Sequence, residues 1–167
     1  MEFFCEKSGD VGFKNIDPFL ARLISIPFGV QSEEWITLCD ELLSSRCKED
    51  LEFTSDWKEY VEPGIISLLA SCHDMVISDL SKMECSSAHA PEKQLFALTI
   101  PKDHREAWLR MLNVARLSLA AKHQFSSQEI NEQKICSVSL PRREALLQMQ
   151  LFSMMQQCLI EVEEDLT

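Results

Sequence analysis

The segment from Leu98 to Leu119, LTIPKDHREAWLRMLNVARLSL, decides how this chain folds. A short apolar run ends at Pro101, because proline lacks the backbone donor that a regular ladder needs. A helix from about 102 to 125 follows, and its apolar residues cover most of its circumference: Trp108, Leu109, Met111, Leu112, Val114, Ala115, Leu117, Leu119 and Ala121. A helix that is apolar on nearly every side is expected to lie among other helices.

Two polar residues interrupt this apolar helix. Asn113 and Arg116, three positions apart, share one side of it, with Trp108 packing beside them. We interpret them as a partly buried structural pair at the centre of a bundle. A guanidinium group removed from water needs a carboxylate and further acceptors. The candidate carboxylates on other predicted helices are Asp40, Glu41 and Asp79.

Working outward, cap and turn signals place the other elements. Ser8-Gly9-Asp10 separates two apolar runs and predicts a β-hairpin over 2–15. Asp17-Pro18 is typical of a helix start. The remaining predicted helices span about 32–46, 63–83, 128–136 and 141–163. The prediction is a mainly α protein, a single-domain helical bundle over 1–167 with a small N-terminal hairpin.

The last predicted helix has an apolar arc wider than one packing partner requires, and it is rich in methionine. Methionine-rich surfaces adapt readily to partners. The candidate interface residues are Leu147, Leu151, Met154, Met155 and Cys158. Two interpretations stay open: the helix is wedged into the protein's own core, or it forms a homodimer or partner interface.

Composition excludes several classes of function. The 167 residues carry a net charge of −11, and 46% are hydrophobic, enough for a full core. Nucleic-acid binding depends on clustered Lys and Arg, which this chain lacks, and an anionic protein is repelled by an anionic membrane. The first residues do not form a signal peptide, and no apolar run approaches bilayer length. We therefore expect a cytoplasmic protein that binds neither nucleic acid nor membrane.

Residues that could carry chemistry are few. His73 and Asp79 fall on the apolar arc of the helix over 63–83, but their spacing does not favour direct contact. Cys72-His73 and Cys85-x3-His89 offer nitrogen and sulfur ligands for zinc, without the close paired spacing of structural zinc sites. We expect a satisfied core histidine, no cofactor and no enzyme activity.

The seven cysteines are scattered without a CxxC pair, so we expect reduced thiols that pack as small hydrophobes. Cys47 lies between Arg46 and Lys48, and nearby positive charge favours the thiolate form. A redox sensor that uses Cys47 is therefore an alternative.

The segment LTIPKDHREAWLRMLNVARLSLAAKHQF is similar to the signature of the bacterial DUF2017 family. Trp108-Leu109, Leu112-Asn113, Arg116-Leu117 and Leu119 fit that signature, whereas Val114 replaces its aspartate and Ala120-Ala121-Lys122 stands in its glycine region. Without a local aspartate, Arg116 has more need of a carboxylate on another helix. The resemblance implies a hairpin followed by helices, no cofactor and no established catalytic site. It also implies a link to stress-responsive regulation and regulated proteolysis, since actinobacterial members often lie beside genes for a Clp-protease adaptor.

The leading hypothesis is a non-enzymatic cytoplasmic regulatory protein that acts through protein contacts. The first alternative is a small metal-binding protein or hydrolase that uses His73 and Asp79, or Cys85 and His89. The second alternative is the thiol sensor.

Overall fold

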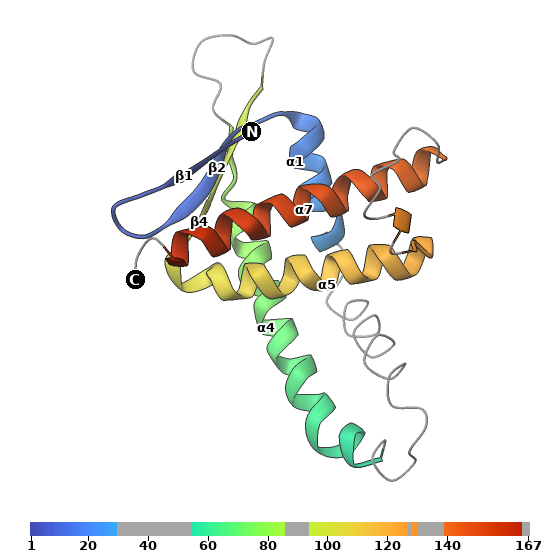
Figure 1. Cartoon of the computed structure of the whole chain (residues 1–167). Coiled ribbons are helices and arrows are strands. Elements are labelled where there is room, and N and C mark those ends of the chain that lie inside the picture. Colours follow the sequence, from blue (N-terminus) through green and yellow to red (C-terminus); the bar gives the residue numbers. More distant parts are fainter. Residues whose placement is uncertain (30–54, 86–93, 127, 130–138, 165–167) are drawn as a thin grey trace.

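The structure, a computed structural model, describes residues 1–29, 55–85, 94–126, 128–129 and 139–164. Its strands form one antiparallel sheet in the order β1-β2-β4-β3. The hairpin consists of β1 (Glu2–Cys5) and β2 (Val11–Ile16), as predicted. The apolar run before Pro101 is β4 (Phe96–Ile100), which pairs with β2 on one side and with the short β3 (Glu84–Cys85) on the other. The sheet is thus larger than the hairpin alone (Figure 1).

One face of the sheet forms part of the core, because alternate strand residues point the same way. Its buried residues are Val11, Phe13, Ile16, Leu98 and Ile100. Gly12 occupies a position where β1, β2 and β4 come close together. A Cβ atom there would lie 2.3 Å from the Leu98 carbonyl oxygen and 2.6 Å from the Phe4 ring.

The local start signals of the helices act as expected. Helix α1 (Pro18–Ser25) is capped by Asp17, whose Oδ1 accepts from the Leu20 backbone N–H at 2.9 Å. Pro63 stands in the first turn of α4 (Glu62–Ser81), after a π-helical turn, η2 (Trp57–Val61). The other helices are η1 (Ile26–Phe28), η3 (Lys102–His104), α5 (Arg105–His123) and α7 (Leu140–Glu164).

Helices α5 and α7 lie side by side and run in opposite directions, and α4 crosses them (Figure 1). Their shared core contains Trp108, Phe28 and Phe152, whose rings are about 6 Å apart: Phe28 lies 6.1 Å from Trp108 and 6.2 Å from Phe152. The buried apolar residues of α4 are Cys72 and Val76 in its C-terminal half, and Leu69 packs against the same core. The N-terminal half of α4 extends away from the sheet and the helix pair (Figure 1).

The predicted mainly α class is confirmed. The predicted helices over 102–125 and 141–163 correspond to η3 with α5, and to α7. The helix predicted over 32–46 lies outside the described residues, as does most of the one predicted over 128–136. Within the described ranges, no helix has both the length and the apolar character needed to cross a bilayer.

Candidate functional site: a cavity and a polar network at opposite ends of α5

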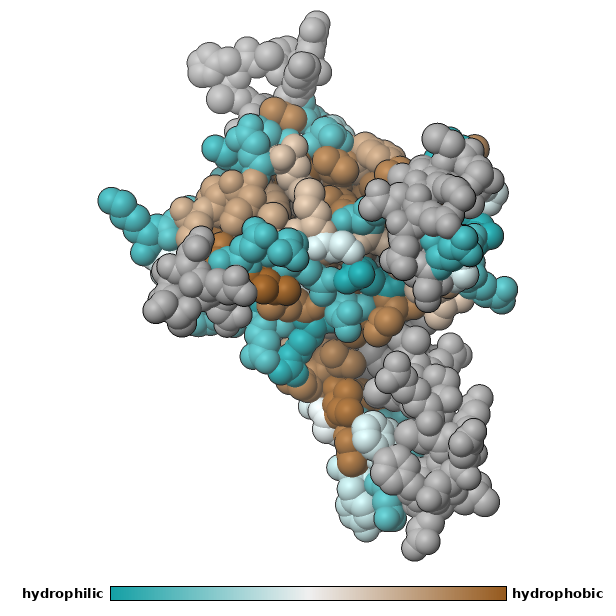
Figure 2. All heavy atoms as spheres, viewed as in Figure 1, coloured by the Kyte–Doolittle hydropathy of each residue, from teal (hydrophilic) through white to brown (hydrophobic). Residues whose placement is uncertain are grey.

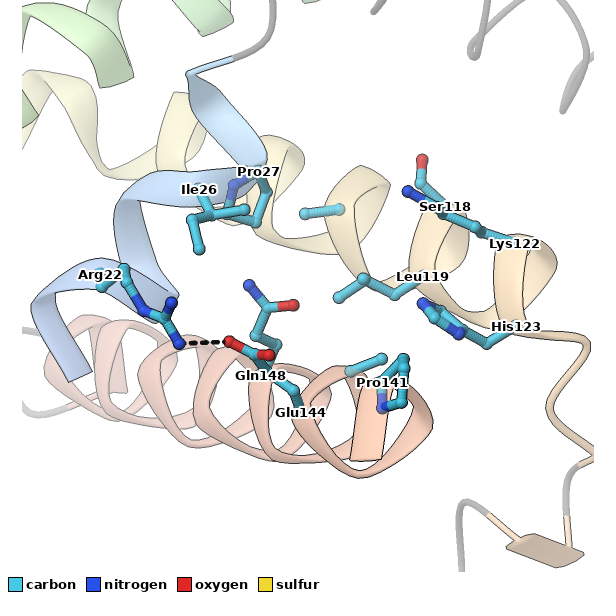
Figure 3. Close-up of a pocket in the computed structure, with 12 residues that line it drawn as sticks. Arg22, Ile26, Pro27, Ser118, Leu119, Lys122, His123, Pro141, Glu144 and Gln148 are labelled. Carbon is cyan, nitrogen blue, oxygen red and sulfur yellow. Dashed lines mark hydrogen bonds and ion pairs between the residues drawn. The ribbon is translucent and has the colours of Figure 1, made fainter. Parts of the chain in front are cut away.

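A cavity of about 530 Å³ opens where α1 and η1 face the C-terminal part of α5 and the start of α7 (Figure 3). This volume is within the range of small-molecule sites. Apolar side chains form much of its wall, and the polar groups stand at its two ends and its centre. The lining residues are Arg22, Ile26, Pro27, Ala115, Ser118, Leu119, Lys122, His123, Pro141, Glu144, Ala145 and Gln148.

Gln148 lies at the centre of the cavity with its amide pointing inward (Figure 3). The residue is only 5% exposed. Its Nε2 donates to the Leu23 carbonyl oxygen at 3.0 Å, and this contact fixes the orientation of the amide. At one end of the cavity, Arg22 pairs with Glu144, with 2.6 Å between Nη2 and Oε1.

Lys122 and His123 form the other end of the cavity. Burial, and then the positive charges of Lys122 and Arg142, lower the pKa of His123 below its ordinary value. The ring of His123 stacks on Phe125 at 5.6 Å, and the Arg142 guanidinium lies 4.9 Å from the centre of the same Phe125 ring. This end of the cavity is therefore positively charged and held in place by aromatic contacts.

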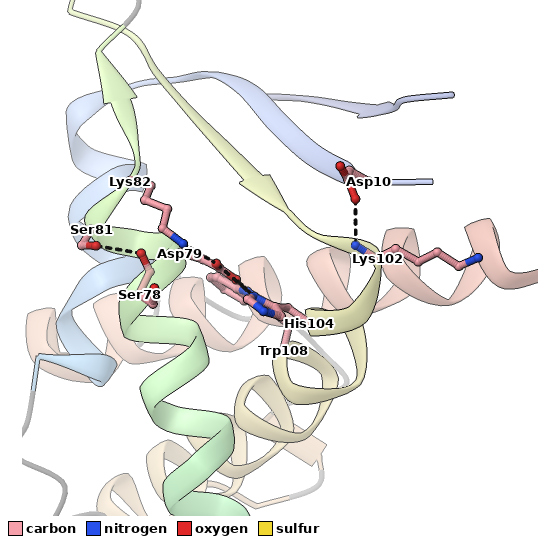
Figure 4. A network of polar contacts seen from close by, with 8 residues as sticks. All are labelled: Asp10, Ser78, Asp79, Ser81, Lys82, Lys102, His104 and Trp108. Atoms are coloured by element: carbon pink, nitrogen blue, oxygen red, sulfur yellow. Dashed lines mark hydrogen bonds and ion pairs between the residues drawn. The ribbon is translucent and has the colours of Figure 1, made fainter. Parts of the chain in front are cut away.

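A second polar cluster, the Asp79 network, stands at the N-terminal end of α5 (Figure 4). The fully buried Asp79 carboxylate accepts from Trp108 Nε1 at 3.0 Å and lies 2.9 Å from His104 Nδ1. Lys82 Nζ stands 3.7 Å from its other oxygen. These three side chains satisfy a charge that would otherwise be costly to bury.

The Asp79 network and the cavity do not form a single site. His104 and Lys122 stand 18 positions apart along η3 and α5, which corresponds to about 27 Å of helix. Sequence reasoning gave no functional role to His104 or to the cavity residues. The signal for His104 was its spacing of four residues from Trp108, which places both side chains on one helix face.

The structure separates the residues of the hydrolase and metal hypothesis. His73 is buried, and its Nε2 lies 3.2 Å from the Phe28 carbonyl oxygen, whereas Asp79 belongs to the network with His104. The expected satisfied core histidine fits this contact. Cys85 is exposed on β3, and His89 lies outside the described residues. No three His, Cys, Asp or Glu side chains gather in metal-binding geometry in the described part of the chain.

The Asn113 and Arg116 pair needs correction. Asn113 is exposed, because α5 buries the opposite side, on which Trp108 lies. Arg116 is half-buried, and its Nη1 donates to Gln156 Oε1 of α7 at 2.6 Å. The prediction of a carboxylate partner is therefore wrong for Asp79, which is bound elsewhere. The other candidates, Asp40 and Glu41, lie outside the described residues.

The candidate interface on α7 mostly faces inward. Leu151 and Met155 are buried, and Leu147 and Cys158 pack against the core, so that Met154 alone of the five is exposed. The core interpretation of this helix therefore accounts for four of the five residues.

Burial disfavours the thiolate form at two of the described cysteines. Burial raises the pKa of the Cys72 thiol and also that of Cys158. Cys5 and Cys85 are exposed, and Cys47, the candidate redox residue, lies outside the described residues.

An apolar face of α4 and η2 is partly exposed to solvent. Val61, Ile65, Leu68 and Met75 recur at helical spacing, and we call these four residues the α4 strip. Leu68 is 44% exposed, whereas Cys72 of the same face is buried against the rest of the protein. Figure 2 shows hydrophobic residues along this extended part of α4.

Comparison with known proteins identifies the family. A scan against protein-family models matches residues 37–163 to DUF2017, a domain of unknown function. Neither the curated proteins nor the solved structures compared with this chain give a match. The match includes the whole segment from Leu98 to Phe125 whose residues resemble the family signature. The chain therefore belongs to the DUF2017 family.

Proposed function

We propose that this protein is a non-enzymatic regulatory protein of the cytoplasm that acts by binding another protein through the α4 strip. The observation that carries the proposal is the strip itself, because a contiguous row of solvent-exposed apolar side chains is typical of a protein-binding surface. The setting that the family resemblance suggests is stress response or regulated proteolysis.

The geometry of the strip suits a helical partner. Its spacings of four, three and seven residues place the side chains on one side of an extended helix. A partner helix can lay its own apolar face along such a row. Leu68 is 44% exposed, so burying the rest of its side chain contributes about 1 kcal/mol to association.

Charge favours a cationic partner over a second copy of the chain. Three acidic residues are exposed near the strip, Asp56, Glu59 and Asp74, and Lys58 of η2 is an exposed basic residue among them. Two chains of net charge −11 repel each other, whereas a lysine-rich helix is attracted. The proposed occupant is therefore a basic amphipathic helix of the partner, and a homodimer is the competing assembly.

A non-enzymatic role accords with the state of the candidate acid–base groups. Asp79 is held by Trp108 and His104, and His73 contacts the backbone of η1. Groups held in this way are not aimed at a common substrate position, as nucleophile and base must be.

The test is fluorescence anisotropy with a labelled helical peptide of roughly 18 residues, or five turns, that carries leucine on one face and lysine on the other. We expect Leu68→Gln to weaken binding roughly fivefold, which is the fold-change that corresponds to about 1 kcal/mol. The matched control is Leu117→Gln, since Leu117 is 49% exposed and belongs to α5 and not to the helix that carries the strip. A peptide with glutamate in place of lysine should bind far more weakly.

Two outcomes would contradict the proposal. Equal weakening by Leu68→Gln and Leu117→Gln would show that the peptide binds wherever leucine is exposed. A wild-type dimer in sedimentation that becomes a monomer on Leu68→Gln would assign the strip to a second copy of the chain.

A further inference from the structure

The cavity between α1, α5 and α7 has features that the protein-binding role does not use. Arg22 and Lys122 contribute two positive charges to its lining and Glu144 one negative charge, so the ionised lining residues sum to one positive charge. The whole chain carries −11. A positive cavity in so acidic a protein is a site where an anion is favoured over the rest of the surface.

The apolar and polar groups of the cavity are separated in space. Ile26, Pro27, Leu119 and Pro141 line its walls, and Lys122 and His123 stand together at one end (Figure 3). A ligand that fills the cavity would thus bury an apolar body and place its charge at that end. Ligand pockets commonly combine apolar walls with a few polar groups that fix orientation.

Gln148 supplies the orienting group. Its Nε2 donates one of its two N–H groups to the Leu23 carbonyl oxygen, and its amide oxygen, which accepts from none of the described residues, can accept from a ligand. Because the side chain is nine-tenths buried and aimed into the cavity, this acceptor is fixed before binding.

We propose that the cavity binds a small organic carboxylate with an apolar, ring-sized body and an N–H or O–H donor, its charge at Lys122 and His123 and its donor on Gln148. The carboxylate accepts from the Lys122 ammonium group, and the apolar body displaces water from the walls. The inference does not rest on the α4 strip, which lies on a different helix.

The test is isothermal titration calorimetry of the full chain with indole-3-propionate, which has all three chemical features. We expect one molecule bound per chain. The neutral indole-3-propionamide should bind roughly tenfold more weakly, because it lacks the charge that strengthens the contact with Lys122. Lys122→Met should weaken indole-3-propionate to a similar extent, and the control Lys58→Met on η2 should leave it unchanged.

Two further variants test the geometry. Gln148→Leu should weaken indole-3-propionate several-fold but leave naphthalene-1-propionate, which has no N–H, nearly unchanged. Leu119→Trp should abolish binding of both by filling the cavity, with a retained near-ultraviolet circular dichroism spectrum as the check on folding. The inference is overturned if indole-3-propionate does not bind at millimolar concentration. It is also overturned if indole-3-propionamide binds the wild type as tightly as indole-3-propionate does and Lys122→Met binds indole-3-propionate as tightly as the wild type does.

Discussion

Replacing Asp79 by alanine tests whether the Asp79 network holds α4 against α5. The carboxylate is fully buried and accepts from Trp108 Nε1 at 3.0 Å, with His104 Nδ1 at 2.9 Å. A hydrogen bond to a charged group contributes about 1.5–3 kcal/mol, and two such bonds lead us to expect a loss of about 3–5 kcal/mol. Lys82 adds little, because its ammonium group is exposed to solvent.

The assay is urea denaturation followed by far-ultraviolet circular dichroism, which does not depend on tryptophan emission. The matched control is Asp74→Ala on the same helix, since the Asp74 side chain is 80% exposed. We expect this control to change the free energy of unfolding by less than about 0.5 kcal/mol. If Asp79→Ala lowers the free energy of unfolding by less than about 1 kcal/mol, that result refutes the argument, because removing a buried carboxylate leaves its two donors without their acceptor.

A double-mutant cycle separates the hydrogen bond from the volume of the indole ring. Trp108→Phe removes both, but in the Asp79→Ala background the hydrogen bond is already absent and only the volume is lost. The coupling energy between the two sites should therefore be about 1.5–3 kcal/mol. A coupling below about 0.5 kcal/mol, the scatter of independent sites, would show that the 3.0 Å contact contributes nothing.

Three further predictions concern other parts of the chain. Gly12→Ala should lower the free energy of unfolding by about 1–3 kcal/mol and reduce Tm, because its Cβ would lie 2.3 Å from the Leu98 carbonyl oxygen; an unchanged Tm would contradict the close approach. Cys5 should be alkylated in the native protein and Cys72 only after denaturation, as peptide mass spectrometry can measure, because burial excludes reagent and raises the pKa of Cys72; equal rates would contradict this. Burial and neighbouring cations lower the pKa of His123, so the unfolded chain binds its proton more readily and the free energy of unfolding should fall as pH drops through the ordinary imidazole range. In His123→Gln, the urea midpoint should therefore depend less on pH between neutral and mildly acidic conditions. The same pH dependence in the variant and the wild type would contradict the lowered pKa.

The sequence predicts the helices whose start signals act within a single turn. Asp17 caps α1 through a bond to a backbone N–H three residues later, and Pro63 occupies the first turn of α4. Such signals need no knowledge of the rest of the fold. The family resemblance likewise depends on a contiguous segment, and for that reason the 28 residues from Leu98 to Phe125 were enough to indicate it.

The sites could not be predicted in the same way, because each joins residues far apart in the chain. Asp79 and His104 are 25 residues apart, and Gln148 reaches a carbonyl 125 residues earlier. The pairing of β2 with β4 joins residues between 80 apart (Ile16 and Phe96) and 89 apart (Val11 and Ile100). Helical periodicity shows which side chains face inward, but it does not show which of them meet. The cavity exists only once α1, α5 and α7 are assembled, so no local pattern marks it.

Among the described residues, Arg116 has a neutral hydrogen-bond partner where the local rule pointed to Asp79. The argument for a carboxylate assumed that the guanidinium is removed from water, yet Arg116 remains half-buried and keeps part of its hydration. Gln156 accepts from Arg116 Nη1 at 2.6 Å, and its own Nε2 donates to the Leu109 carbonyl oxygen of α5 at 3.1 Å. One amide thus binds α5 at two points without adding a second charge, on a helix where this chain has Val114 in place of the aspartate of the family signature.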